Sequence, residues 1–363
     1  MREALRGLTT RGRAFLAAGL TATVTGLLLD QVPLLRAGLL ATVLTLAWVV
    51  LVGRSRYRLT LHRSVTPTSV TAGQAAKVEL AMTNEGASPR GIMFIEEHVP
   101  YALGSRPRFT LEGVTRGWHG TLNYTVRSDA RGRFEIGPVS VRASDPFNFV
   151  EYHRAFRGTT TLTVTPRVVP LGPIQLTGAW TGSGDNRPRA FATGSAEDVT
   201  VREYRQGDDL RRVHWRSSAR VGELMVRREE QPWQSRATVF LDNREDSHRG
   251  TGLASTFETA VIVAASAAVH LTRRGFLVRL VTATGEETGP QWHMRDEEAN
   301  RRALLESLAV VDLIRRKGVE SDWLVERGHS GIIVGAFGRI HAEDRGVLRR
   351  MATHSGAALA IAL

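Results

Sequence analysis

Residues 201–230 read VREYRQGDDLRRVHWRSSARVGELMVRREE. This short span combines aspartates, many arginines, a histidine and a tryptophan, a density of opposed charges that a connecting loop does not need. Such a composition is typical of an internal ion-pair network or of a docking surface with aromatic anchors. Because buried ion pairs contribute little net stability, we favour the docking surface. The residues expected to contact a partner are Tyr204, Arg205, Asp208, Asp209, Arg211, Arg212, Trp215 and Arg220.

The spacing within this segment resembles the signature of the bacterial family called domain of unknown function 58. The matching elements are Arg202-Glu203-Tyr204-Arg205, Gly207-Asp208-Asp209-Leu210-Arg211, Trp215, Ser218-Ala219-Arg220 and Gly222. Two positions depart from the family pattern, since Gln206 replaces a proline and His214 an aspartate. Residues 130–138, 144–147 and 164–167 resemble further parts of the same pattern. The resemblance implies a membrane-associated protein that ends in a von Willebrand factor type A-like domain.

The same resemblance implies a non-enzymatic scaffold or adaptor. Members of the family commonly occur beside MoxR-type AAA+ ATPases, and sometimes beside transglutaminase-like membrane proteins. We therefore expect the chain to recruit such partners, a MoxR-type ATPase first, at the cytoplasmic face of the membrane. Two alternatives remain open: a metal-dependent von Willebrand factor type A adhesion module, and a hydrolase that uses His214 with nearby carboxylates.

The composition limits the other function classes. The 363 residues are enough for two ordinary domains and an anchor, and the absence of cysteine excludes disulfides, thiolate metal sites and cysteine nucleophiles. The net charge of +12 could indicate nucleic acid or anionic lipid. Arginines are spread along the whole chain among acids, and lysine occurs only at Lys77 and Lys317. This pattern favours attraction to a membrane surface, and we expect no nucleic-acid partner.

The N-terminal region predicts a membrane anchor. After a basic segment at residues 1–13, residues 14–52 are almost entirely apolar, which is too long for one helix across roughly 30 Å of hydrocarbon. Two transmembrane helices within residues 14–53 fit better, one at 14–29 and one from 34 or 37 to 52, with Pro33 and its polar neighbours in the turn. A cleaved signal peptide and a buried helical hairpin in a soluble protein are the competing interpretations.

Flanking charges predict the orientation of this hairpin. Four arginines precede the first helix and four follow the second, whereas the tip carries only Arg36, offset by Asp30. The positive-inside rule therefore places the N-terminus and the C-terminal domains of a two-pass cell-membrane protein in the cytoplasm. The eight flanking residues are Arg2, Arg6, Arg11, Arg13, Arg54, Arg56, Arg58 and Arg63.

Residues 57–167 predict an all-β domain. Apolar residues alternate at 58–61, 77–82, 121–126 and 161–164, and turn signals separate these runs. Strands at this spacing with no helical run indicate an antiparallel, immunoglobulin-like sandwich. The segment Asp145-Pro146-Phe147 is interpreted as an Asx turn with a buried phenylalanine, in preference to a partner contact. Residues 168–200, rich in Gly, Pro, Ser and Thr, are expected to be a linker.

Within the signature segment, 201–230, we expect a turn at 207–209 followed by a short helix that an aspartate caps. The indole of Trp215 would then stack under the guanidinium of Arg211, four residues earlier. His214 could act as a general base, but no serine, cysteine or metal partner is evident, so a hydrogen-bonded histidine is the favoured interpretation. Residues 224–227 are expected to form a strand.

Residues 231–363 predict an α/β domain. Apolar strands at 238–241, 276–281, 331–335 and 357–363 alternate with helical patterns at 257–271, 297–311 and 344–352. This alternation indicates a mainly parallel, doubly wound sheet. Here the family resemblance implies a von Willebrand factor type A-like fold. The whole chain is thus a multidomain protein with a helical hairpin, a β-sandwich and an α/β domain.

Domains of this type often hold Mg²⁺ at the end of the first strand, through Asp-x-Ser-x-Ser. This chain has Asp242-Asn243-Arg244-Glu245-Asp246 there, and a guanidinium at Arg244 would repel the ion and could replace it by pairing with Asp242 and Asp246. We therefore expect no Mg²⁺ and no other cofactor, and regard Asp242 and Asp246 as a degenerate metal site. No P-loop, HExxH or GxSxG motif occurs, so no catalytic residue is predicted.

Overall fold

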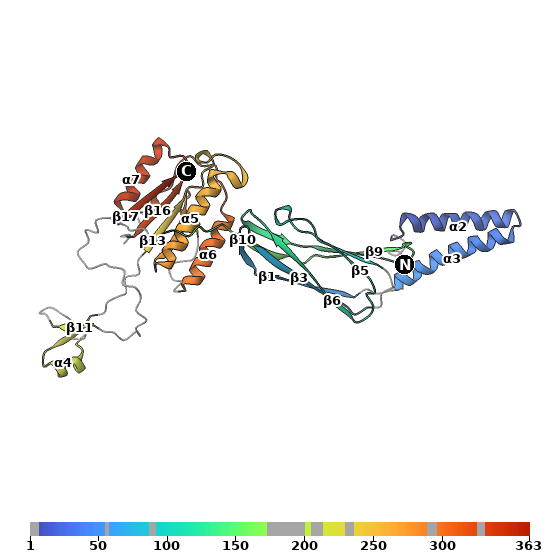
Figure 1. The fold of residues 1–363 in the computed structure, drawn as a ribbon, viewed down its shortest axis with the longest axis horizontal. Coiled ribbons are helices and arrows are strands. Elements are labelled where there is room, and N and C mark those ends of the chain that lie inside the picture. The colour runs from blue at the N-terminus through green and yellow to red at the C-terminus, as the bar shows by residue number, and fades with distance from the viewer. Residues whose placement is uncertain are drawn as a thin grey trace. The chain divides into compact units, whose positions relative to one another are not determined.

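The computed structural model describes residues 7–54, 58–86, 92–172, 200–204, 213–228, 236–288, 296–324 and 331–363 (Figure 1). The chain divides into two compact units. The first comprises Met1–Val169 with Gly250–Ala265 and Leu305–Asp312, and the second Pro170–Arg249 with Ser266–Leu304 and Leu313–Leu363. Each unit is described by itself below.

The first unit begins with two helices that lie side by side, α2 (Thr10–Leu28) and α3 (Val32–Arg54) (Figure 1). Small residues allow their close approach, since a Cβ on Gly19 would lie 2.7 Å from Thr42 Oγ1. The prediction of a helix pair is confirmed. The position predicted for the turn is wrong, because residues 29–31 connect the helices, with Asp30 at φ 50°, and Pro33 lies in the first turn of α3. Proline is tolerated there because the first amides of a helix have no partner within it.

One described helix segment, Val32–Leu51, is long and apolar enough to cross a membrane. Its mean hydropathy is 2.1 and only 17% of it is buried. Large apolar side chains on α2 are exposed as well, including Leu27 (71%) and Leu28 (78%). The chain therefore has a candidate membrane helix near its N-terminus, packed against a second apolar helix.

Three small sheets follow the helix pair in the first unit. Their strands are β1 (Leu59–Thr66), β3 (Ala75–Asn84) and β6 (Trp118–Arg127) in the first sheet; β5 (Arg108–Leu111), β4 (Met93–Glu97), β8 (Val139–Ser144) and β9 (Glu151–Phe156) in the second; and β2 (Ser69–Thr71), β10 (Thr160–Thr165) and β7 (Gly132–Ile136) in the third. A 3-10 helix, η1 (Tyr101–Leu103), follows β4. All pairings are antiparallel except β2 with β10.

Side-chain alternation places the core of this β domain between sheets. Along β3 every second residue is buried, among them Val78 and Leu80, which is the pattern of a strand with one face covered. Leu80 shares a hydrophobic cluster with Ile95 of β4 and Val141 of β8, so the first and second sheets pack face to face. The four runs of alternating residues predicted as strands are confirmed, and the β domain is a sandwich.

A buried polar group lies beside this core. Glu97, fully buried, accepts a hydrogen bond from the hydroxyl of Tyr124 and pairs with Arg63 at 2.5 Å. Burial, together with the hydrogen bond to Glu97, raises the pKa of Tyr124 well above its usual range. The three side chains therefore join three different strands, β1, β4 and β6.

The second unit holds a five-stranded sheet with the order β15-β14-β13-β16-β17. The strands are β13 (Arg236–Leu241), β14 (Leu277–Thr282), β15 (Glu287–Thr288), β16 (Ile332–Phe337) and β17 (Ala357–Ala362), all parallel except β15. The helices of this part of the chain are α5 (Thr256–Arg273), α6 (Glu297–Val310) and α7 (Arg345–Thr353), with 3-10 helices η3 (Glu245–Ser247), η4 (Gly252–Ala254), η5 (Asp322–Leu324) and η6 (Ala342–Asp344). The predicted α/β alternation is confirmed.

The order of the four parallel strands determines where side chains can converge. The sheet starts at β13 and extends to β14 on one side and to β16 and β17 on the other, so the winding reverses between β13 and β16. Loops that leave the carboxyl ends of these two strands diverge, and side chains there can meet in the crevice. One face of the sheet is covered by a cluster that includes Phe240, Trp323, Phe337 and Met351.

Candidate partner-binding surface and buried ion triad

The signature segment folds locally into two short strands and a helix. β11 (Thr200–Glu203) pairs antiparallel with β12 (Met225–Arg228), and the seven-residue helix α4 (Trp215–Val221) lies between them in sequence. Val213 and Val226 form a bridge and are both buried. The strand predicted at 224–227 is confirmed as β12. Met225 is half-buried and Val226 is buried, so these two residues attach β12 to the module.

The ends of α4 are held by its own side chains. His214 is the N-cap, and its Nδ1 accepts a hydrogen bond from the backbone N–H of Ser217 at 3.3 Å. Gly222 ends the helix in the left-handed region, at φ 84°. Ser218 Oγ donates to the carbonyl of His214 at 3.1 Å and accepts from the N–H of Met225 at 2.8 Å, so it fastens α4 to β12.

The outer side of this module presents an aromatic ring among cations. Trp215 is 70% exposed, and Arg216 and Arg220 are exposed as well. The two arginines are four residues apart and therefore share one face of the helix. Val221 and Leu224 add exposed apolar area at its end. We call these five residues the α4 surface.

The predicted contact residues divide into three groups. Trp215 and Arg220 lie on the α4 surface, whereas Tyr204 is half-buried and its N–H donates to the carbonyl of Leu224 at 2.8 Å. The other five predicted residues lie outside the described ranges, together with the expected turn at 207–209 and the stacking of Trp215 under Arg211. These five are Arg205, Asp208, Asp209, Arg211 and Arg212.

His214 has a serine partner that the sequence reasoning missed. Ser217 Oγ lies 2.8 Å from Nδ1 of the imidazole. The spacing of three residues at a helix start is the signal that could have revealed the pair, because an N-cap side chain reaches the third helical residue. Within the described part of the chain no carboxylate forms an ion pair with His214. The pair therefore has a capping role, and its hydroxyl and imidazole are also the groups that nucleophilic catalysis would need.

A buried ion triad lies at the reversal point of the large sheet. Asp242 follows β13, Arg244 comes two residues later, and Asp344 ends η6 after β16. The guanidinium binds Asp242 through Nε and Nη2, both at 2.9 Å, and Asp344 through Nη1 at 2.8 Å and Nη2 at 2.9 Å. Nη1 also donates to the carbonyl of Lys317 at 3.1 Å. All five guanidinium donors are therefore used.

The triad is almost inaccessible to water. Side-chain exposures are 1% for Arg244, 0% for Asp242 and 3% for Asp344. Burial alone would lower the pKa of Arg244, but hydrogen bonds to Asp242 and Asp344 raise it above its usual range. Burial alone would raise the pKa of Asp344, but hydrogen bonds from Arg244 and from the N–H of His341 lower it. Arg244 and Asp344 are thus held in their charged forms.

This arrangement does not fit a divalent cation. The guanidinium lies between the two carboxylates that would have to bind the metal, and a cation adjacent to it would be repelled. Pairing of Arg244 with Asp242 was expected from the sequence, but the second carboxylate is Asp344, and Asp246 is exposed. Among the described residues, no group of three or more His, Asp or Glu side chains is placed to hold a metal ion.

A second buried arginine connects elements of the first unit. Arg131, in the loop before β7, donates from Nε to the carbonyl of Leu308 at 2.9 Å and from Nη2 to that of Val311 at 2.5 Å. It also pairs with Glu258, and its guanidinium lies 5.0 Å from the ring centroid of Phe257. Residues 308 and 311 are at the C-terminal end of α6, where a cation is stabilised by free carbonyls. Arg131 therefore anchors the β7 loop to the ends of α5 and α6.

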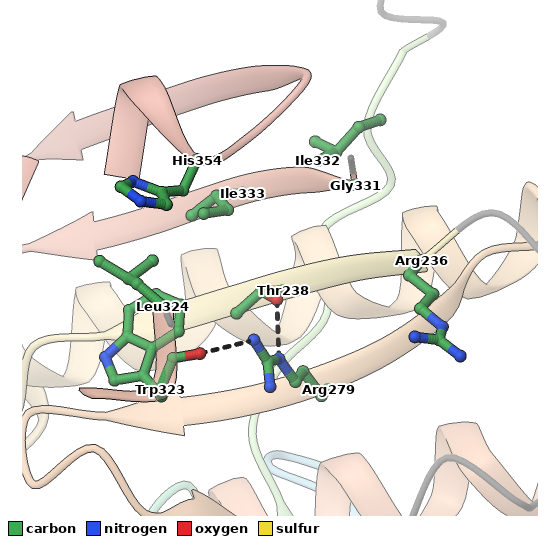
Figure 2. Close-up of a pocket in the computed structure, with 9 residues that line it drawn as sticks. All are labelled: Arg236, Thr238, Arg279, Trp323, Leu324, Gly331, Ile332, Ile333 and His354. Carbon is green, nitrogen blue, oxygen red and sulfur yellow. Dashed lines mark hydrogen bonds between the residues drawn. The ribbon is translucent and has the colours of Figure 1, made fainter. Parts of the chain in front are cut away.

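A hollow in the second unit contains a third buried arginine (Figure 2). Arg279 of β14 is 3% exposed and donates from Nε to Thr238 Oγ1 at 2.9 Å and from Nη2 to the carbonyl of Trp323 at 3.4 Å. Its guanidinium also lies 5.6 Å from the ring centroid of Trp323. Figure 2 shows Arg236 pointing away from this group. These contacts of Arg279 attach η5 to β13 and β14.

Comparison with known proteins identifies one region. Residues 200–315 match the family described as "Protein of unknown function DUF58". That range begins at β11 and includes the α4 surface, Arg244 and all of α6. No curated protein matches the chain.

Solved structures give only distant likenesses. One is the CARDB domain of a Pyrococcus furiosus protein in complex with di-metal ions, at 15% identity, covering 30% of this chain and 93% of that one, with a TM-score of 0.22. Another is the complex of zinc 2-glycoprotein and prolactin-inducible protein from human seminal plasma, at 14% identity, 31% and 98% coverage, and a TM-score of 0.23. A third is the putative ApaA protein of Bordetella pertussis, at 10% identity, 30% and 94% coverage, and a TM-score of 0.21. TM-scores of this size do not establish a shared fold.

Fold and surface together define a multidomain protein with an apolar helix pair, a β-sandwich and an α/β domain, and with exposed aromatic and cationic residues on a small appended module. Within this chain, residues 200–315 are similar to the family of unknown function DUF58.

Proposed function

We propose that this protein is a membrane-anchored scaffold that recruits a protein partner, such as a MoxR-type AAA+ ATPase, at the cytoplasmic face of the membrane. The observation that carries the proposal is the α4 surface, on which Trp215 is 70% exposed beside two exposed arginines. Tryptophan and arginine are the residues that most often dominate the binding energy of protein interfaces. Within the described part of this module, no packing contact explains why the Trp215 ring is so exposed, whereas a binding partner would cover it.

Anchoring is supported by the helix pair. The apolar segment Val32–Leu51 is long enough to span a membrane, and α2 packs along it with its own apolar side chains exposed. In the proposal both α2 and α3 cross the membrane, and the arginines that flank the pair keep both chain ends in the cytoplasm. A transglutaminase-like membrane protein is a further candidate partner in the same membrane.

The α/β domain acts in this proposal as a von Willebrand factor type A-like platform that needs no metal ion. The reversal of winding between β13 and β16 is the position at which such a domain would bind a cation and, through it, a ligand. Arg244 supplies a fixed positive charge there and is fully enclosed by Asp242, Asp344 and a backbone carbonyl. Recruitment therefore depends on the α4 surface and not on this crevice.

The experiment is capture of a MoxR-type ATPase from the source cells by the purified full-length chain in nanodiscs. We expect Trp215→Ala to lower the recovered ATPase by about 30-fold, since a central tryptophan contributes roughly 2 kcal/mol or more to an interface. The matched control is Tyr101→Ala, which removes an aromatic ring that is 98% exposed on the sandwich and should change nothing. Equal recovery by wild type and Trp215→Ala, or no ATPase with either, would count against the proposal.

A second candidate function, hydrolysis, is favoured by one observation, the 2.8 Å contact between Ser217 Oγ and His214 Nδ1. If this pair were catalytic, a fluorophosphonate probe would label Ser217, and His214→Gln would abolish the labelling. The scaffold proposal predicts no labelling of the folded protein at Ser217, and peptide mapping by mass spectrometry distinguishes the two.

A further inference from the structure

We propose that a groove at the base of the helix pair binds the headgroup of a phosphatidylethanolamine molecule from the surrounding membrane. The inference rests on the membrane anchoring proposed above. The groove lies in the first unit, between the first turn of α2 and the second sheet of the sandwich. Its lining includes Thr10, Arg11, Phe94, Arg142, Asn148 and Glu151.

Aromatic contacts place this groove at the level of lipid headgroups. Trp48, near the end of the apolar segment of α3, lies 5.7 Å from the ring of Phe147 in the loop between β8 and β9. Phe147 stacks on Phe149 at 5.6 Å, and Phe149 contacts Phe15 of α2 at 5.1 Å. Aromatic side chains of membrane proteins gather at the membrane–water interface. Arg11 precedes Phe15 by one helical turn, which is roughly 6 Å farther from the hydrocarbon.

The walls of the groove are fixed to one another. Leu8 forms a bridge with Val150, the N–H of Glu151 donates to the carbonyl of Gly7 at 2.8 Å, and the N–H of Thr9 donates to that of Phe149 at 2.9 Å. The segment before α2 thus extends the edge of the second sheet. A Cβ on Gly12 would lie 2.3 Å from the carbonyl oxygen of Phe149, so α2 and the sandwich are in direct backbone contact. A ligand would meet a pre-formed site, which lowers the entropic cost of binding.

The cationic side of the groove suits a phosphate. Arg11 is exposed at the start of α2, where the first backbone amides of the helix also favour an anion. Arg142 is about half exposed, and its Nη2 approaches Glu96 only to 3.7 Å. Glu96 is already bound to Arg108 at 3.0 Å, so Arg142 is weakly neutralised by the protein. Two guanidinium groups can therefore turn to one phosphate.

The acidic side of the groove distinguishes between headgroups. Both oxygens of Asp145 accept backbone N–H groups, from Phe147 at 2.8 Å and from Val150 at 2.5 Å, so this carboxylate is satisfied within its own turn. Glu151 remains, with His153 at 3.3 Å as its neighbour. A primary ammonium can donate hydrogen bonds to Glu151 while its phosphate binds the arginines. Phosphatidylglycerol lacks the ammonium, and the quaternary group of phosphatidylcholine has no N–H to donate.

The test is native mass spectrometry of the full-length chain released from nanodiscs that contain equal parts of phosphatidylethanolamine, phosphatidylglycerol and phosphatidylcholine. We expect the wild type to retain phosphatidylethanolamine in preference to the other two. Arg11→Gln with Arg142→Gln should lower the retained lipid about tenfold, because charge-assisted hydrogen bonds to phosphate are lost. Glu151→Gln should keep phospholipid but remove the preference for phosphatidylethanolamine over phosphatidylglycerol.

The matched control is Arg13→Gln with Arg116→Gln, which removes the same charge from two exposed positions outside the groove. This control should retain as much lipid as the wild type. Equal retention by the wild type and by the Arg11/Arg142 variant, or a wild-type preference for either other lipid, overturns the proposal. If the wild-type chain does not float with vesicles, the proposed membrane anchoring is wrong as well. If it floats and captures the ATPase but shows no lipid preference, only the proposed headgroup site is wrong.

Discussion

Removal of the buried guanidinium is the most direct perturbation of the α/β domain. In Arg244→Met the side-chain volume is largely kept, but Asp242 and Asp344 remain buried with no cation between them. Breaking a buried ion pair by removing one partner typically costs about 3–5 kcal/mol. Two carboxylates lose their partner here, so we expect a loss of about 4 kcal/mol.

Hydrogen exchange in the full-length chain gives a local readout of this loss. The slowest amides of β13 and β16, the two strands that the triad joins, should report the opening of the sheet. A loss of about 4 kcal/mol corresponds to roughly a thousandfold lower protection, at about 1.36 kcal/mol for each factor of ten. Amides of the sandwich strand β3 supply the internal reference, which should not change.

Two further variants separate the buried charge from other effects. Arg315→Met breaks an ion pair of similar length, 2.9 Å to Glu245, but the Arg315 side chain is 92% exposed, so we expect at most about 1 kcal/mol. The triple variant Asp242→Asn, Arg244→Met, Asp344→Asn removes all three charges and should recover most of the stability. Protection in Arg244→Met that equals the wild type, or a triple variant less stable than Arg244→Met, would refute the reasoning.

Three other outcomes are expected. Arg131→Ala should lower protection at the C-terminal end of α6 by about 2–4 kcal/mol, and Arg131→Lys, which keeps the charge but not the planar fork, should lose less; hydrogen exchange of α6 measures both. Because the folded-state pKa of Asp344 lies below its ordinary value of 3.8, the stability it contributes should be complete above about pH 4 and lost as the pH falls through the folded pKa; acid titration of wild type against Asp344→Asn, in which this part of the dependence disappears, checks the sign. Tyr124→Phe leaves Glu97 without one hydrogen bond and should cost about 1–3 kcal/mol by thermal unfolding, whereas Tyr101→Phe, at a residue that is 98% exposed, should change less.

Local patterns in the sequence predicted much of the architecture. Alternating apolar residues located β1, β3, β6 and β10, because a strand with one covered face repeats every two residues. The helix pair followed from hydropathy, but its turn was misplaced at Pro33 since proline is as acceptable in the first turn of a helix as in a loop. Pro33 is therefore compatible both with a loop that ends one helix and with the first turn of the next helix.

Long-range partners were beyond local reasoning. The Asx turn at Asp145 is confirmed by its bond to the N–H of Phe147. The buried ring, however, is Phe149, whereas Phe147 is 48% exposed. The rings that contact these two, Phe15 and Trp48, come from helices far away in the sequence, so local patterns do not show which ring is covered. Asp344 looked like the start of a basic helix, and its partner Arg244 is 100 residues away in sequence. The sites that the sequence did not predict are those in which the hydrogen-bond partners of a charged side chain come from elements far apart in the chain.

The strand-like segment at residues 7–9 has a practical consequence for fragments of this protein. It covers Phe149 and Val150, which are 3% and 1% exposed while Leu8 and Val49 pack on them. A truncated fragment that starts after the helix pair would uncover this apolar edge at the start of β9, and edges of that kind promote aggregation. Water-soluble versions should therefore carry polar replacements at Phe149 and Val150, or keep the first nine residues tethered beside them.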